Sequence, residues 1–179
     1  MSGFKTPVQL ELGDDGLWYL LAPLVWEGTN GDKVTVPAGA WTDFATVPQW
    51  LQSIIPAAAI WIVRAAIVHD ELCRELEQYE KALAEWEMDM LCGHPTAPPT
   101  PPAFSSVDAD AVFEKIMRDE GASWLAQRIG WTGVRWGAAW SSYRREGWLS
   151  TAPRVARLST LFLAVALGVL ALIGWILPW

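Results

Sequence analysis

Cysteine and histidine are scarce in this sequence: only two of each occur among 179 residues. The cysteines are Cys73 and Cys92, and the histidines are His69 and His94. Two cysteines form at most one disulfide, so the bridged framework of small secreted domains is excluded. A cytoplasmic domain, which the rest of the sequence predicts, would also keep them reduced, so we expect the cysteines to be thiols or metal ligands.

Basic residues are also few, with 13 lysines and arginines against 20 acidic residues and a formal net charge of −7. Nucleic-acid binding needs a concentrated basic surface that neutralises phosphates. Several of the few basic residues lie close together late in the chain, at Arg144, Arg145, Arg154 and Arg157. The sequence therefore argues against DNA or RNA as a partner.

No long apolar stretch follows the first residues, so a secretory signal is not expected. The long apolar run lies instead at the other end, where Leu158 to Trp179 carries no charged residue. About 20 apolar residues cross a bilayer as a helix, which predicts a single transmembrane helix over 158–179 with the lipid bilayer as a partner. The arginines before it predict a basic juxtamembrane linker over 151–157 and a cytoplasmic soluble domain over 1–150.

The first part of the chain predicts a β meander. Three short antiparallel strands are expected at Val8 to Leu12, Trp18 to Trp26 and Lys33 to Val36. The breaks between them, GDDG and GTNGD, contain the glycine, asparagine and aspartate residues that tight turns favour.

Helices are predicted for the rest of the domain. A short one is expected from Thr46 to about Ile55, and a long amphipathic one from Ala57 to about Leu91, because apolar residues recur there every three or four positions. Five prolines between Gly93 and Ala103 exclude its continuation. Further helices are expected from Ser105 or Ser106 to Asp119 and from Ala122 to Arg145. The predicted fold class is α+β: a small N-terminal antiparallel β meander, a helical bundle and one C-terminal transmembrane helix.

Two ionisable residues stand on apolar helix faces. His69 lies on the seam of the long helix, followed by Asp70, and Asp110 shares a face with Phe113 and Met117. An unpaired charge there is costly, so we expect the two helices to bring His69 and Asp110 together. The pair would hold one imidazole nitrogen and leave the other to activate water or bind a metal; alternatively, it only locks the two helices.

Four segments occur in the order of a known family: VPAGAWTDFATVP (36–48), AAIVHD (65–70), DADAVFEKIM (108–117) and VRWG (134–137). Together they resemble the phage and prophage family called domain of unknown function 1353, over roughly 34–140. The resemblance implies that Asp43, His69, Asp70 and Asp110 match the family's recurrent polar positions, and it implies no reaction. Cys73 replaces an aromatic residue of the family pattern, and an acidic, proline-rich insertion spans 75–103.

One enzymatic reading is a metal-dependent hydrolase. A His-Asp pair on one helix with an aspartate on a second is similar to phospholipase A2 enzymes. In that analogy His69 is the general base, Asp110 orients it, and Asp70 binds calcium. We also include Asp43 among the candidate catalytic and metal-binding residues.

Other metal readings are weaker. Phosphohydrolases of the HD type need more than two histidines. A zinc site would join His69 and Cys73 to Cys92 and His94, which lie about five helical turns farther along the same predicted helix. The cofactor, if any, would be a divalent metal, calcium or zinc.

The non-enzymatic reading is a phage-encoded module that binds a host or phage membrane protein, or that serves morphogenesis or lysis, with its polar residues serving the fold. A holin is less consistent, because some 150 residues read as globular. The many tryptophans either pack in the core, which we expect for Trp124, Trp136 and Trp140, or line a surface.

Overall fold

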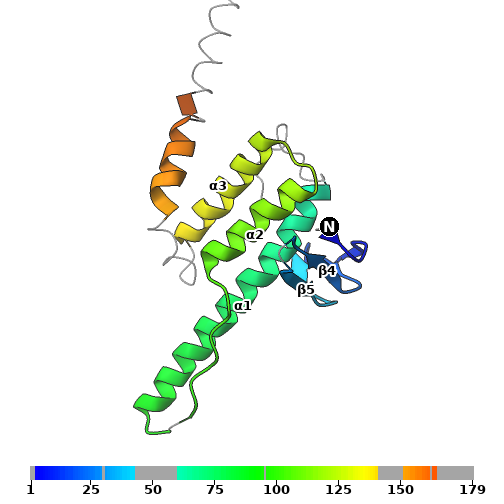
Figure 1. Ribbon diagram of the computed structural model, residues 1–179. Coiled ribbons are helices and arrows are strands. Elements are labelled where there is room, and N and C mark those ends of the chain that lie inside the picture. Colours follow the sequence, from blue (N-terminus) through cyan, green and yellow to red (C-terminus); the bar gives the residue numbers. More distant parts are fainter. Residues whose placement is uncertain are drawn as a thin grey trace, which may run out of the picture.

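The computed structural model describes residues 3–29, 31–42, 60–94, 96–140, 151–161 and 163–164. Within these ranges an N-terminal β region packs beside three helices, and a further helical segment follows at 151–161 (Figure 1). The N-terminal antiparallel strands and the helices after them, which the predicted fold class includes, are present.

The β region consists of two three-stranded antiparallel sheets. In the first, β4 (Leu24–Glu27) lies between β1 (Gly3–Phe4) and β5 (Lys33–Val36). In the second, β3 (Trp18–Leu20) lies between β2 (Leu10–Leu12) and β6 (Trp41–Thr42). The single strand predicted over 18–26 is therefore two strands that belong to different sheets. The predicted β meander is wrong, because β1 pairs with β4 and β3 pairs with β6 instead of each strand pairing with the next one along the chain.

Glycine allows the tight turns of this region. Gly16 has φ +80° in the β2–β3 turn, and Gly31 has φ +85° in the β4–β5 turn. Both values lie where L residues with a side chain are strained. The Asp15 carboxylate completes the first turn by accepting bonds from the Leu17 amide at 3.0 Å and the Tyr19 hydroxyl at 2.6 Å.

Three helices form the bundle: α1 (Ile60–Leu91), α2 (Ser106–Asp119) and α3 (Trp124–Trp140). α2 begins with a capping box, in which the Ser105 hydroxyl accepts from the Asp108 amide and the Asp108 carboxylate accepts from the Ser105 amide. The predicted short helix from Thr46 to Ile55 and the end of the predicted 122–145 helix lie outside the described residues.

The core joins the sheets to α1 and α2. It contains Leu20, Leu24 and Trp26 from the strands and matching apolar residues from the helices: Ile62, Ala65, Val68, Leu72, Ala109, Phe113, Ile116 and Met117. The predicted seam of α1 is buried from Ile62 to Leu76 and not beyond it. The prediction that Trp124 and Trp136 pack in the core is wrong, because Trp124 is 59% exposed and Trp136 is 45% exposed.

The prediction of a transmembrane helix over 158–179 is wrong, which corrects both the predicted fold class and the predicted localisation. In the part of the chain that the structure describes, no helix is long and apolar enough to cross a membrane. Residues 165–179 lie outside that part. The predicted single-pass membrane localisation, with its cytoplasmic domain, is therefore not supported.

The physical reason concerns the helical segment 151–161, which includes the start of the predicted span. Val155 is 1% exposed and Arg154 donates to Glu114 of α2 at 3.3 Å. The Arg154 guanidinium also lies 3.9 Å from the ring centroid of Trp131 in α3. Charged and buried contacts thus attach the segment to the bundle. Its sequence also contains a second arginine, Arg157, one turn after Arg154.

Candidate functional site

The two ionisable residues of the apolar helix faces meet in the core. His69 of α1 and Asp110 of α2 are separated by 41 positions, and Nε2 of His69 lies 2.7 Å from Oδ1 of Asp110. His69 is 5% exposed and Asp110 is 0% exposed. The ring edge of Phe113 packs against the imidazole, with centroids 5.5 Å apart. The contact between His69 and Asp110, predicted because an unpaired buried charge is costly, is present.

Arg135 of α3 completes this group, and the sequence reasoning did not find it. Its Nη1 donates to Oδ2 of Asp110, and its Nε donates to the Thr151 hydroxyl at 3.0 Å. Arg135 is 0% exposed. A signal existed, because Trp131, Arg135 and Ala138 recur at positions i, i+4 and i+7 of one helix face. We call His69, Asp110 and Arg135 the buried charge network; it joins α1, α2 and α3.

The surroundings of His69 favour its charged form. Burial is the largest single effect and by itself lowers the pKa of His69, but hydrogen bonds to Asp110, Asp70 and Cys73 together outweigh it and raise that pKa well above 6.5. An imidazolium between two carboxylates is stabilised by both of them. The shift favours the charged form of His69, in which both ring nitrogens act as donors.

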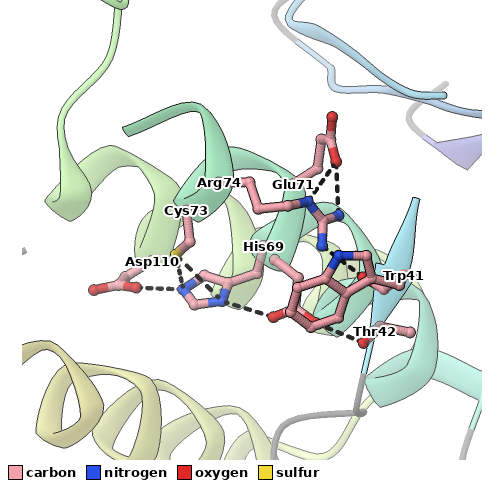
Figure 2. A network of polar contacts seen from close by, with 8 residues as sticks. Trp41, Thr42, His69, Glu71, Cys73, Arg74 and Asp110 are labelled. Atoms are coloured by element: carbon pink, nitrogen blue, oxygen red, sulfur yellow. Dashed lines mark hydrogen bonds and ion pairs between the residues drawn. The ribbon is translucent and has the colours of Figure 1, made fainter. Parts of the chain in front are cut away.

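The second ring nitrogen faces Asp70. Figure 2 shows the imidazole of His69 between Asp110 on one side and Thr42 on the other. Nδ1 lies 3.8 Å from Oδ1 of Asp70, and Oδ2 of Asp70 accepts from the Thr42 hydroxyl at 2.5 Å. Asp43, the third candidate catalytic residue, follows Thr42 in the chain but lies outside the described residues.

A second polar group holds β6 against α1 next to this site. Arg74 donates to the Glu71 carboxylate at 2.7 and 3.2 Å and to the Trp41 carbonyl at 2.6 Å (Figure 2). Its guanidinium also lies 5.1 Å from the ring centroid of Trp41. These contacts attach β6 to the helix and so place Thr42 at Asp70.

Cys73 does not form a nucleophile–base pair with His69. Its Sγ lies 3.6 Å from Nε2 and 3.9 Å from Nδ1, so it is close to both nitrogens, and Asp110 already bonds Nε2. A Cys-His-Asp triad needs the thiol and the carboxylate on opposite nitrogens. Cys73 is buried and free.

The described residues contain no group of three or more His, Cys, Asp or Glu side chains that could hold a metal ion. The zinc reading needed Cys92 beside Cys73, but Cys92 is exposed at the end of α1 and Cys73 is buried. Asp70 alone remains of the predicted calcium ligands within the described residues. The possible contribution of Asp43 lies outside them.

Comparison with known proteins places the chain in a family. Residues 18–134 match the model of a protein family of unknown function, DUF1353, and the chain belongs to it. No curated protein and no solved structure matches the chain.

Proposed function

We propose that this chain is a non-enzymatic interaction module whose buried charge network serves the fold. The observation that carries this proposal is the use of Asp110: one carboxylate oxygen accepts from His69 and the other from Arg135. Three helices each contribute one charged residue, and each of the three is at most 5% exposed. Such an arrangement fixes the relative placement of helices, because any other packing leaves a buried charge without its partner.

The charge state of His69 supports the same conclusion. A general base must be unprotonated at the working pH, and useful bases have a pKa near that pH. The neighbouring carboxylates raise the pKa of His69 well above 6.5 even though burial opposes them. His69 therefore serves better as a buried cation than as a proton acceptor.

A phage or prophage origin is part of this proposal, with a partner among host or phage proteins and a role in morphogenesis or lysis. It rests on the ordered motifs in 36–48, 65–70, 108–117 and 134–137. Membership of DUF1353 is consistent with it and names no activity.

A comparison of single and combined substitutions tests the structural role. Asp110→Leu leaves Arg135 and His69 buried without their carboxylate, and we expect it to lower the free energy of unfolding by about 3–5 kcal/mol. The triple variant His69→Leu, Asp110→Leu, Arg135→Met removes all three charges, and we expect it to regain most of that loss. Urea unfolding measures both. A triple variant as unstable as Asp110→Leu would contradict the proposal.

A second function, phospholipase A2-like hydrolysis, is favoured by one observation: Asp110 holds Nε2 of His69, while Nδ1 points toward Asp70. This matches the orienter and metal-ligand roles of the analogy. Fatty-acid release from short-chain phospholipid with calcium, lost in His69→Gln, would establish hydrolysis and overturn the interaction module. We expect no release that depends on His69.

A further inference from the structure

The distal half of α1 extends beyond the bundle. At 1.5 Å per residue, 32 residues give a helix of about 48 Å, whereas the 14 residues of α2 give about 21 Å. Figure 1 shows the lower part of α1 running past α2 and α3, accompanied by the segment that returns to α2. We call residues 77–91 the arm; none of them is buried, whereas Leu76 just before them is 8% exposed.

The arm is held as a defined element and not as a loose extension. Its residues continue α1 without a break, and Nε1 of Trp86 donates to the carbonyl of Thr96 in the returning segment at 2.9 Å. The returning segment contains Pro98, Pro99, Pro101 and Pro102, whose rings restrict the backbone. Tyr79, Leu83 and Trp86 are half-buried, so one face of the arm is covered and the opposite face is open.

The open surface of the arm is acidic. Its sequence contains five acidic residues, Glu77, Glu80, Glu85, Glu87 and Asp89, against the single Lys81, which gives a net charge of −4 out of −7 for the chain. Lys81 pairs with Glu77 at 2.7 Å. More than half of the net charge of the molecule therefore lies on one projecting element.

The arm ends in exposed apolar side chains. Met88 is 60% exposed, Met90 is 44% exposed and Leu91 is 84% exposed. Exposed methionines are flexible and polarizable, and they are frequent at adaptable binding surfaces. Glu87 and Asp89 alternate with these residues along the helix. The tip thus combines an apolar anchor with flanking negative charge, which is how a specific interface is built.

We infer that the arm docks its tip against an apolar surface of a partner protein, such as the apolar face of a helix, that lysine and arginine flank. Charge complementarity selects this partner: the net charge of −4 repels nucleic acid and also repels the same arm of a second copy. This inference rests on the proposed interaction function and adds its surface and the chemistry of its partner.

A labelled 14-residue helical peptide of leucine and lysine, with leucines on one face, serves as the probe. Fluorescence anisotropy measures its dissociation constant for the full chain at low and high salt. We expect binding that weakens as salt rises, because rim charges are screened, and no binding of the peptide with glutamate in place of lysine.

Two pairs of matched variants locate the binding. Met88→Ser with Leu91→Ser and Glu87→Gln with Asp89→Asn should each weaken binding at least about fivefold. Their controls, Leu12→Ser with Leu21→Ser and Glu11→Gln with Asp14→Asn, make the same kinds of change at exposed residues of the β region and should leave binding unchanged.

Absence of binding, equal binding by all variants, or self-association of the chain that the tip variant abolishes would each overturn the inference. These outcomes are independent of the urea and hydrolysis experiments, since none of the variants changes the buried charge network. Hydrolysis that depends on His69 would contradict the proposed non-enzymatic function even if the arm binds the peptide.

Discussion

The ionisation of His69 is the most consequential property of a single residue in this fold. Burial removes it from water and by itself lowers its pKa, and its contacts with Asp110, Asp70 and Cys73 make the charged form favourable there. Arg135 shares Asp110 and supplies the second positive charge. One aspartate therefore supports two buried cations, which makes Asp110 the residue on which the others depend.

We predict that stability decreases as pH rises above the ordinary range of histidine. The pKa of folded His69 is raised, so its contribution is fully present below the unfolded value of about 6.5 and is lost as pH rises through the folded pKa. Urea unfolding between pH 6 and 9 should show a loss whose slope approaches about 1.4 kcal/mol per pH unit for one proton.

The exposed histidine gives the control for this experiment. His94→Gln should keep the pH dependence of the native chain, because His94 is exposed, whereas His69→Gln should remove it. If the slope persists in His69→Gln, then His69 does not carry this dependence and its charged state in the fold is wrong.

At the scale of elements, α2 places the aspartate of the network. The proline-rich segment ends at Ser105, whose hydroxyl and amide form a reciprocal pair with Asp108. The hydrogen bonds from Ser105 lower the pKa of the Asp108 carboxyl. A helix start defined in this way sets which residues face the core, so Ala109, Asp110 and Phe113 point inward together.

We predict that Ser105→Ala lowers the free energy of unfolding by about 1 kcal/mol, because the Asp108 amide loses its acceptor at the start of α2. Ser105→Thr retains a hydroxyl and should cost only a small part of this. Thermal or urea unfolding of the three proteins measures the difference. Equal losses in both variants would assign the effect to packing at Ser105 and not to the cap.

At the scale of the whole molecule, local signals predicted the helices better than the sheets. The prolines after Gly93 and the serine at 105 are local features, and they correctly bound α1 and α2. The run over 18–26 reads as one strand, but its two halves pair with strands of different sheets, and such pairing depends on distant partners. Met90 continues the seam of α1 in sequence yet is 44% exposed, because no buried contact extends that far along the helix.

The site was predictable in part for a related reason. A charged residue on an apolar helix face needs a partner, and this argument joined His69 to Asp110 from the sequence. The same argument applied to the face of Trp131 and Ala138 would have added Arg135. It could not state which carboxylate oxygen serves which cation, or the charge state of His69, because both depend on the packed arrangement.

The last prediction concerns the attachment of the helical segment 151–161 to the rest of the molecule. Within the described residues, the contacts of 151–161 with the bundle are what attach the segment to it. Val155 provides the buried apolar contact, and Arg154 adds the interactions with Glu114 and Trp131. Val155→Asp would bury a carboxylate without a partner, and this cost favours release of the segment from the bundle. We expect amide hydrogen exchange across 151–161 to accelerate at least about tenfold, a loss of about 1.4 kcal/mol of local stability.

Ala156→Asp, at the exposed neighbouring position, is the matched control and should leave exchange unchanged. Equal acceleration in both variants would mean that charge on the segment, and not the burial of Val155, governs its attachment.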